Sequence, residues 1–196
     1  MKKHSTSLHE VAFDDVSLYD GLLKRHEADN RSYLMELTSD NLMYNYELEA
    51  AITHDACIRP GIHGGWESPS SQLRGHFPGH WLSAAAMHYA ETGDMELKAK
   101  ADVIIDRLEK CQQANGGSWV ASIPEKFLHF IAKGHGIWAP HYTIHKTFMG
   151  LVDMYRYAGN EKALTIADNF ADWFLDWSTK FDRKQFDDIL DFETGG

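Results

Sequence analysis

The chain has 196 residues, of which 43% are hydrophobic and 24% charged, so it fits one globular domain or part of one and not a disordered or collagen-like protein. It carries 19 basic and 29 acidic side chains, and the net charge of -10 argues against a nucleic-acid partner. No stretch is long and apolar enough to span a membrane, and the basic N-terminus is not followed by the apolar segment of a secretory signal, so we expect a cytoplasmic protein.

The N-terminal region, residues 16–48, is expected to be helical in two or three pieces. Breaks are expected near Asn30 and near residues 38–40, where Ser39 or Asp40 would cap the last piece. One short strand would fit within residues 10–18, but nothing in the sequence predicts a β-sheet.

Four further helices are expected as two pairs, each an apolar inner helix followed by an amphipathic outer one: residues 78–92 with 95–114, and residues 140–158 with 161–178. Pro78 suits the first turn of its helix. A glycine followed by Asp94 or Asn160 separates the two helices of each pair. The two glycine breaks lie in similar hexapeptides, YAETGD and YRYAGN, that are 66 residues apart. This spacing predicts a repeated helical hairpin.

Repeated hairpins with buried inner helices occur in α/α toroids and in α-solenoids. The long, aromatic and glycine-rich connections at residues 57–75 and 116–139 favour the toroid, because solenoid linkers are short. We therefore expect an all-α fold that forms the N-terminal part of an (α/α)6 toroid. A closed ring of six such hairpins needs about 400 residues. Residues 1–196 are thus expected to be the N-terminal portion of a single domain, truncated at its C-terminal end.

Residues 64–80 are the richest in chemical groups, with Trp66, Glu67, Arg74, His76 and His80 at the entrance to a buried helix. Such a mixture suits a sugar, whose hydroxyls need fixed donors and acceptors and whose C–H face packs on aromatic rings. The alternative is a structural loop, in which Glu67 pairs with Arg74 and the histidines bond to backbone carbonyls.

Two pairs of histidines stand four residues apart: His76 with His80, and His141 with His145. This spacing is weak evidence for a metal site, because no acidic third ligand follows at a diagnostic interval. If Pro78 begins its helix, His76 lies outside it and need not share a face with His80. Cys57 and Cys111 lack the spacing of a zinc ribbon and are expected to be reduced thiols without a visible role.

The last residues, 191–196, place Asp191 and Glu193 beside two glycines. Glycosidases use two carboxyl-type groups, or one carboxyl group and another nucleophile, on either side of the bond that breaks. Glu193 is a candidate by composition, and the alternative is that it continues a run of surface acids.

Five segments carry a resemblance to a known family: residues 65–69 (GWESP), 72–84 (QLRGHFPGHWLSA), 111–117 (CQQANGG), 138–146 (WAPHYTIHK) and 190–196 (LDFETGG). They resemble, in the same order, the signatures GWE-P, ELRGHFLGHYLSA, CQ-ANGDGY, WAPWYTLHK and LDTEFGGMNE of glycoside hydrolase family 127, the β-L-arabinofuranosidase family. The chain departs from these signatures at Gln72, Pro78 and Thr194, where the family has Glu, Leu and Phe.

The resemblance implies an (α/α)6 barrel that hydrolyses L-arabinofuranosides with retention. In characterised members the nucleophile is a cysteine thiolate held on zinc by further cysteines and a glutamate, another glutamate is the acid/base, and all of these lie beyond the position of Gly196. The resemblance therefore implies zinc for the full-length enzyme, and neither metal nor activity is expected in residues 1–196 alone.

The resemblance also implies site residues in this chain. His145 corresponds to the family histidine that contacts the sugar, and His76, His80 and Arg74 correspond to the pocket wall. Trp66, Glu67 and Glu193 complete the expected carbohydrate-binding set. Two other readings stay open, namely a sugar epimerase or unsaturated glucuronyl hydrolase on the same toroid, and a non-catalytic helical interaction module.

Overall fold

The computed structural model describes residues 11–52 and 61–192. Its elements are, in chain order, η1 (Phe13–Asp15), α1 (Leu22–Glu36), α2 (Ser39–Glu49), η2 (Gly65–Glu67), α3 (His76–Thr92), α4 (Met95–Ala114), α5 (Lys126–Ile131), α6 (Pro140–Ala158), α7 (Glu161–Ser178) and α8 (Arg183–Phe192). No strand occurs in these two ranges, which confirms the all-α fold. The short strand expected within residues 10–18 is wrong for residues 11–18, where η1 packs Phe13 edge-on against Tyr157.

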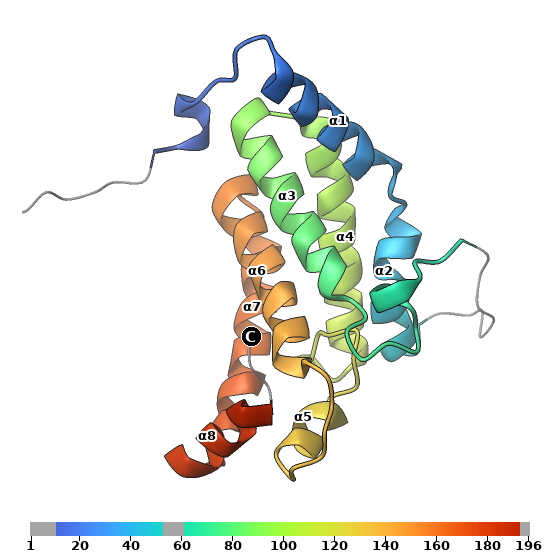
Figure 1. Cartoon of the computed structure of the whole chain (residues 1–196), viewed down its shortest axis with the longest axis vertical. Coiled ribbons are helices and arrows are strands. Elements are labelled where there is room, and N and C mark those ends of the chain that lie inside the picture. Colours follow the sequence, from blue (N-terminus) through green and yellow to red (C-terminus); the bar gives the residue numbers. More distant parts are fainter. Residues whose placement is uncertain (1–10, 53–60, 193–196) are drawn as a thin grey trace, which may run out of the picture.

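The two expected hairpins are α3 with α4 and α6 with α7, and they form a portion of a helical-hairpin toroid. The inner helices α3 and α6 lie side by side and run in the same direction, so their N-termini meet at one end of the molecule (Figure 1). The outer helices α4 and α7 return along them and contact each other. The boundaries of α4, α6 and α7 match the predicted ranges, whereas α3 begins two residues earlier than predicted.

Both hairpins turn by the same local device. Gly93 and Gly159 end the inner helices with φ of 71° and 65°, a left-handed conformation that other residues adopt only at a cost. The next residue then caps the outer helix: the Asp94 carboxylate accepts hydrogen bonds from the amides of Glu96 and Leu97, and the Asn160 side chain accepts one from Ala163. This explains why the 66-residue echo in the sequence falls at these turns.

The core lies between the inner and outer helices. Trp81, Ala85 and Leu151 of the inner helices are almost fully buried, as are Ile104 of α4 and Phe170 of α7. Apolar burial of this kind contributes about 25 cal/mol for each Å² removed from water. None of the described helices combines the length and apolar character needed to span a membrane.

The helices α3 and α6 cross at two glycines. A Cβ atom added to Gly79 would lie 1.9 Å from the carbonyl oxygen of Lys146, and one added to Gly150 would lie 2.8 Å from the carbonyl oxygen of Gly79. The backbones therefore approach as closely as they do because both positions lack a side chain. This close contact brings the first turns of the two inner helices together.

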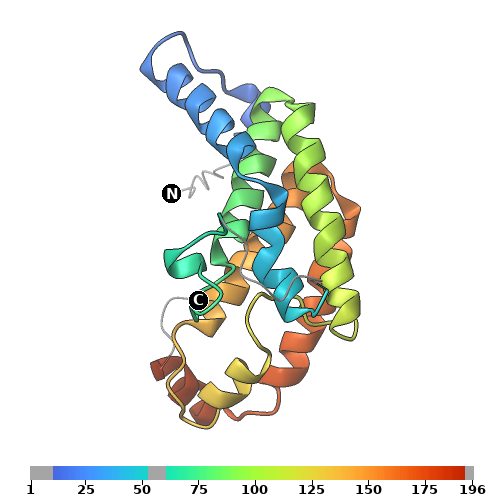
Figure 2. The ribbon, with the colours of Figure 1, turned by 90° about the vertical axis from the view of Figure 1, so that its right-hand side faces the viewer.

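The N-terminal helices differ in part from prediction. The break expected near Asn30 is wrong, because α1 is continuous from Leu22 to Glu36. The break near residues 38–40 is confirmed, but the cap of α2 is Thr38, whose hydroxyl accepts a hydrogen bond from the Asn41 amide, and not Ser39 or Asp40. α1 extends beyond the two hairpins at the end opposite to α5 and α8 (Figure 2).

The end of α1 is fixed by a lysine from α4. The Lys100 ammonium donates hydrogen bonds to the carbonyl oxygens of Leu34, Met35 and Leu37. Carbonyls in the last turn of a helix have no partner within it, so the ammonium satisfies groups that would otherwise need water. This long-range contact thus links the end of α1 to α4.

Candidate functional site

The candidate site lies where α3 and α6 begin, and α2 holds the loop that precedes α3. The Asn45 side-chain amide of α2 donates a hydrogen bond of 2.8 Å to the carbonyl of Glu67. The Tyr46 hydroxyl donates to the Gly75 carbonyl at 2.9 Å and lies 2.7 Å from the Thr147 hydroxyl of α6. These buried contacts hold α2, the loop and both inner helices together. We call the region around the N-terminal ends of α3 and α6 the mouth.

The Glu67 carboxylate anchors the start of α3. One oxygen accepts from the Gly75 amide at 2.7 Å, and the other accepts from the Phe77 amide at 2.9 Å and lies 2.7 Å from Nδ1 of His76. A negative group is favourable here, because the first amides of a helix have no internal partner and the helix dipole is positive at this end.

The helix α3 therefore begins at His76, and the expectation that Pro78 begins it is wrong. Proline is tolerated in the first turn, where its missing N–H would have no partner within the helix. As a result His76 and His80 lie one turn apart on the same helix, with ring centroids 6.1 Å apart.

Arg74 turns away from Glu67. Its guanidinium donates to the Ser71 carbonyl at 3.0 Å and to the Glu49 carboxylate at 3.3 Å, and it lies 6.0 Å from the ring centroid of Phe127. The alternative in which Glu67 pairs with Arg74 is thus wrong, because each has another partner. Arg74 therefore lies beside the mouth, and its guanidinium is bound to Ser71 and Glu49.

Five rings gather at the mouth, and we call them the aromatic cluster: Trp66, His76, His80, Trp138 and Tyr142. Trp66 and Trp138 come from different loops and meet edge to face with centroids 6.0 Å apart. His76 lies 5.9 Å from the ring of Tyr142, and the Tyr142 hydroxyl is 3.4 Å from Nε2 of His80. Trp66 is 63% exposed and Trp138 53%, so two indoles present their surfaces to solvent beside three polar rings. This combination suits the apolar and polar faces of a sugar.

Sequence reasoning singled out Trp66, His76 and His80 but did not name Trp138 or Tyr142 as site residues. The Gln72 side chain explains how the two loops meet: its amide oxygen accepts a 2.6 Å hydrogen bond from the Trp138 backbone. The available signal was position: Trp138 lies two residues before Pro140, the first residue of α6, and the loop that contains Trp66 likewise precedes α3.

The two histidines of α3 differ electrostatically. The hydrogen bond to Glu67 raises the pKa of His76, whereas burial, followed by the nearby charges of Lys146 and His76, lowers the pKa of His80. The Lys146 ammonium lies 4.7 Å from the ring centroid of Tyr142. The surroundings of His76 thus stabilise its charged form, whereas those of His80 stabilise its neutral form.

His145 lies on the second turn of α6 and is exposed. Burial of part of its ring, followed by the charge of Lys146, lowers its pKa. It lines a pocket of about 400 Å³ together with residues of α6, α7 and α8: His141, Ile144, Phe148, Phe174, Phe186 and Leu190. Apart from the two histidines these side chains are apolar. Glu193, the last expected site residue, lies outside the described residues.

His141 faces the same pocket from a buried position. Its ring contacts Phe174 and Trp177 with centroid distances of 5.9 and 5.5 Å, and both of its nitrogens are buried without a hydrogen-bond partner. Burial lowers the pKa of His141 to about 4. The ring is therefore neutral at physiological pH.

This burial predicts a pH dependence of stability. In the unfolded chain His141 has a pKa of about 6.5, whereas in the folded chain it is about 4. Protonation of His141 therefore does not reduce the unfolding free energy above pH 6.5, and reduces it progressively as pH falls from 6.5 toward 4. When pH falls from 7 to 4.5, we expect the parent chain to lose about 2 kcal/mol more unfolding free energy than His141→Phe loses. Urea unfolding at both pH values measures this, with the exposed His26→Gln as control. Equal losses in parent and variant would contradict it.

The family model for the β-L-arabinofuranosidase GH127 catalytic domain matches residues 15–196. The chain belongs to this family. A comparison with curated proteins finds no match. Membership makes the chain part of a glycoside hydrolase, so the aromatic cluster lies in a carbohydrate-active fold.

The GH127 family implies zinc, but the described part of the chain does not fit a zinc site. Residues 11–52 and 61–192 contain no group of three or more His, Cys, Asp or Glu side chains placed to hold a metal. Cys111 is buried among apolar side chains, and burial raises its pKa to about 12, which disfavours the thiolate that zinc binds. Cys57 lies outside the described residues.

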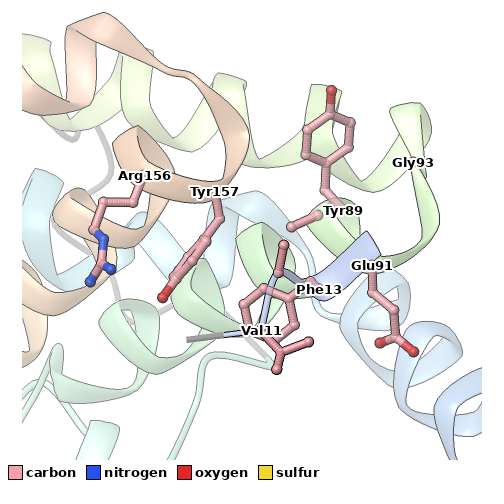
Figure 3. A pocket seen from close by; sticks show the side chains of 9 residues that line it. Val11, Phe13, Tyr89, Glu91, Gly93, Arg156 and Tyr157 are labelled. Atoms are coloured by element: carbon pink, nitrogen blue, oxygen red, sulfur yellow. The ribbon is translucent and has the colours of Figure 1, made fainter. Parts of the chain in front are cut away.

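A second cavity of the GH127 chain, about 650 Å³, lies at the other ends of α3 and α6 (Figure 3). Phe13, Tyr89 and Tyr157 supply rings to it, and Glu91 and Arg156 supply charges. Because it is lined by the C-terminal turns of the inner helices, a ligand there would be a full helix length away from His76. The groups of the candidate site converge at the mouth and not in this cavity.

Proposed function

We propose that the protein is a retaining glycosidase that acts on L-arabinofuranosides, with the sugar bound at the mouth. Family membership over residues 15–196 carries the proposal. The clustering of two exposed indoles with His76, His80 and Tyr142 supports it, because rings that stack and nitrogens that donate or accept are the groups a furanose needs.

Each expected site residue has a role in this proposal. Trp66 packs against the C–H face of the sugar, while His80 and His145 bond its hydroxyls through neutral imidazoles. His76 supplies a further polar contact. Arg74 and Glu67 act on the protein side of the mouth, because their polar contacts are to Glu49, Ser71 and the start of α3.

We assign neither the nucleophile nor the acid/base to a described residue. Glu67, the buried carboxylate at the mouth, already accepts two backbone hydrogen bonds and contacts His76, so it is poorly placed to attack a sugar. Residues 1–196 are accordingly proposed to be the N-terminal portion of one (α/α)6 catalytic domain and to lack activity alone. Glu193 stays a candidate sugar-binding residue, and the proposed location is the cytoplasm.

Hydrolysis of synthetic substrates by the full-length gene product tests this proposal. We expect release of nitrophenol from p-nitrophenyl β-L-arabinofuranoside, with methanol capture giving a methyl glycoside of the same anomeric configuration. An unsaturated uronide serves as the second substrate. Hydrolysis of the uronide alone would contradict the proposal in favour of a glucuronyl hydrolase, and no reaction with either substrate would favour a non-catalytic module.

A further inference from the structure

We propose that Glu67 is a positioning residue that fixes the proton of His76 on Nδ1 and so directs a single free nitrogen, Nε2, toward the sugar. This inference deepens the proposed function and rests on it for the identity of the ligand. The behaviour of the ring itself follows from the contacts at the start of α3.

The contacts of Nδ1 determine which nitrogen carries the proton. Nδ1 lies 2.7 Å from a Glu67 carboxylate oxygen and 2.9 Å from the Leu73 carbonyl oxygen. Both partners are acceptors, so Nδ1 must donate. In the neutral ring Nε2 is then bare, and in the charged ring both nitrogens bear protons.

The Nε2 atom is left for a ligand. No described group forms a hydrogen bond to it, and it is not one of the buried nitrogens that lack a partner. The ring is bordered by Trp66, His80 and Tyr142, which are the neighbouring members of the aromatic cluster. An oxygen of a bound sugar would therefore complete the hydrogen bonding of His76.

Glu67 is held firmly enough to position a ring. It is 9% exposed, and backbone amides of Gly75 and Phe77 bind its two oxygens separately, so the carboxylate plane cannot rotate without breaking one of them. Because these amides belong to the first turn of α3, the helix, the carboxylate and the imidazole form one unit.

The charges around His76 oppose each other. Glu67 stabilises the charged ring, whereas partial burial and the ammonium of Lys146 on α6 disfavour it, and the first effect is the larger. His80 on α3 and Tyr142 on α6 are the other titratable groups against the ring. The charged form makes Nε2 a donor and the neutral form leaves it an acceptor, and Glu67 shifts the balance toward the donor.

Histidine NMR on the 196-residue chain tests the inference without any substrate. Long-range proton–nitrogen spectra of chain labelled with ¹⁵N-histidine, with His76→Gln to assign the signal, report the proton on each nitrogen through a pH titration. We expect Nδ1 to stay protonated above the pKa of His76, and Glu67→Gln to lower that pKa by about one unit or more. Glu49→Gln is the matched control, since it removes a carboxylate that contacts Arg74 and not His76.

Two outcomes would overturn the inference: neutral His76 with its proton on Nε2 in the parent chain, or a Glu67→Gln chain whose His76 pKa matches the Glu49→Gln control. Glutamine keeps one oxygen for the backbone amides, but if the variant does not fold by circular dichroism, a neutral parent ring with its proton on Nε2 still overturns the inference. Failure of the glycosidase assay would leave these spectra unchanged, so the two proposals fail separately.

In the full-length glycosidase the same variant gives a second readout. We expect Glu67→Gln to lower kcat/KM at pH 7 and to lose less at pH 5.5, where a larger fraction of His76 is charged in both proteins. A defect of equal size at both pH values would show that Glu67 supports only the fold and would overturn a role in directing Nε2.

Discussion

Replacing Gly79 with alanine is expected to destabilise the chain by about 3 kcal/mol, which is at the upper end of what overpacking a core costs. The new Cβ atom would lie 1.9 Å from the Lys146 carbonyl oxygen and 2.3 Å from its carbon, and both are backbone atoms that cannot swing aside. α3 and α6 would have to separate. The gain of up to about 1 kcal/mol in helix propensity from Gly to Ala offsets only part of this loss.

Urea unfolding followed by circular dichroism measures the effect. Gly136→Ala is the control, because a Cβ atom there meets nothing within 4 Å. The close crossing of α3 and α6 would be contradicted by a Gly79→Ala chain that unfolds at the same urea concentration as the control.

His145→Ala is expected to lower kcat/KM of the full-length glycosidase by about 10² or more, if the sugar contact strengthens in the transition state. The exposed imidazole lines the pocket of about 400 Å³ between α6, α7 and α8, and no described group hydrogen-bonds to it. Its removal therefore leaves the core intact, and the melting temperature should change little.

Kinetics on p-nitrophenyl β-L-arabinofuranoside and a thermal melt of the same preparation check both parts. His129→Ala is the control, since His129 is also exposed but lies on α5 and pairs with Glu125. A His145 variant with normal activity for each folded molecule and a much lower melting temperature would make this residue structural and remove it from the site.

Much of the fold could be predicted because its signals are local. The hairpin turns follow from Gly93 and Asp94 and from Gly159 and Asn160, whose conformational and capping preferences operate within a few residues. The inner and outer roles follow from hydrophobic periodicity along each helix. These local features are sufficient to predict the boundaries of α4, α6 and α7.

At the candidate site, the errors occurred where a distant contact decides. Pro78 was expected to begin the helix, but Glu67, eight or more positions earlier, stabilises the first turn and moves the start to His76. One alternative reading of the loop paired Glu67 with Arg74, yet α2 supplies Glu49 to that guanidinium. Charge complementarity within one loop allows several pairings, and only the packing of α2 against it selects one.

The composition of the site was therefore easier to predict than its geometry. The sequence places Trp66, His76 and His80 at the entrance of an inner helix, but it does not show that Trp138 and Tyr142 meet them. Those contacts depend on the parallel arrangement of α3 and α6 and on the Gln72 bond to the second loop. The sequence pattern of the segment before α3 does not show how the segment before α6 is placed against it.

The most direct test of the central claim, that the sugar binds at the mouth, is a crystal structure of the full-length protein with L-arabinose. We predict that the furanose ring lies beside Trp66 with oxygens within hydrogen-bond distance of Nε2 of His76 and of the His145 ring. A sugar bound elsewhere, for example in the cavity between Phe13 and Tyr157, with the aromatic cluster free of ligand, would contradict the account.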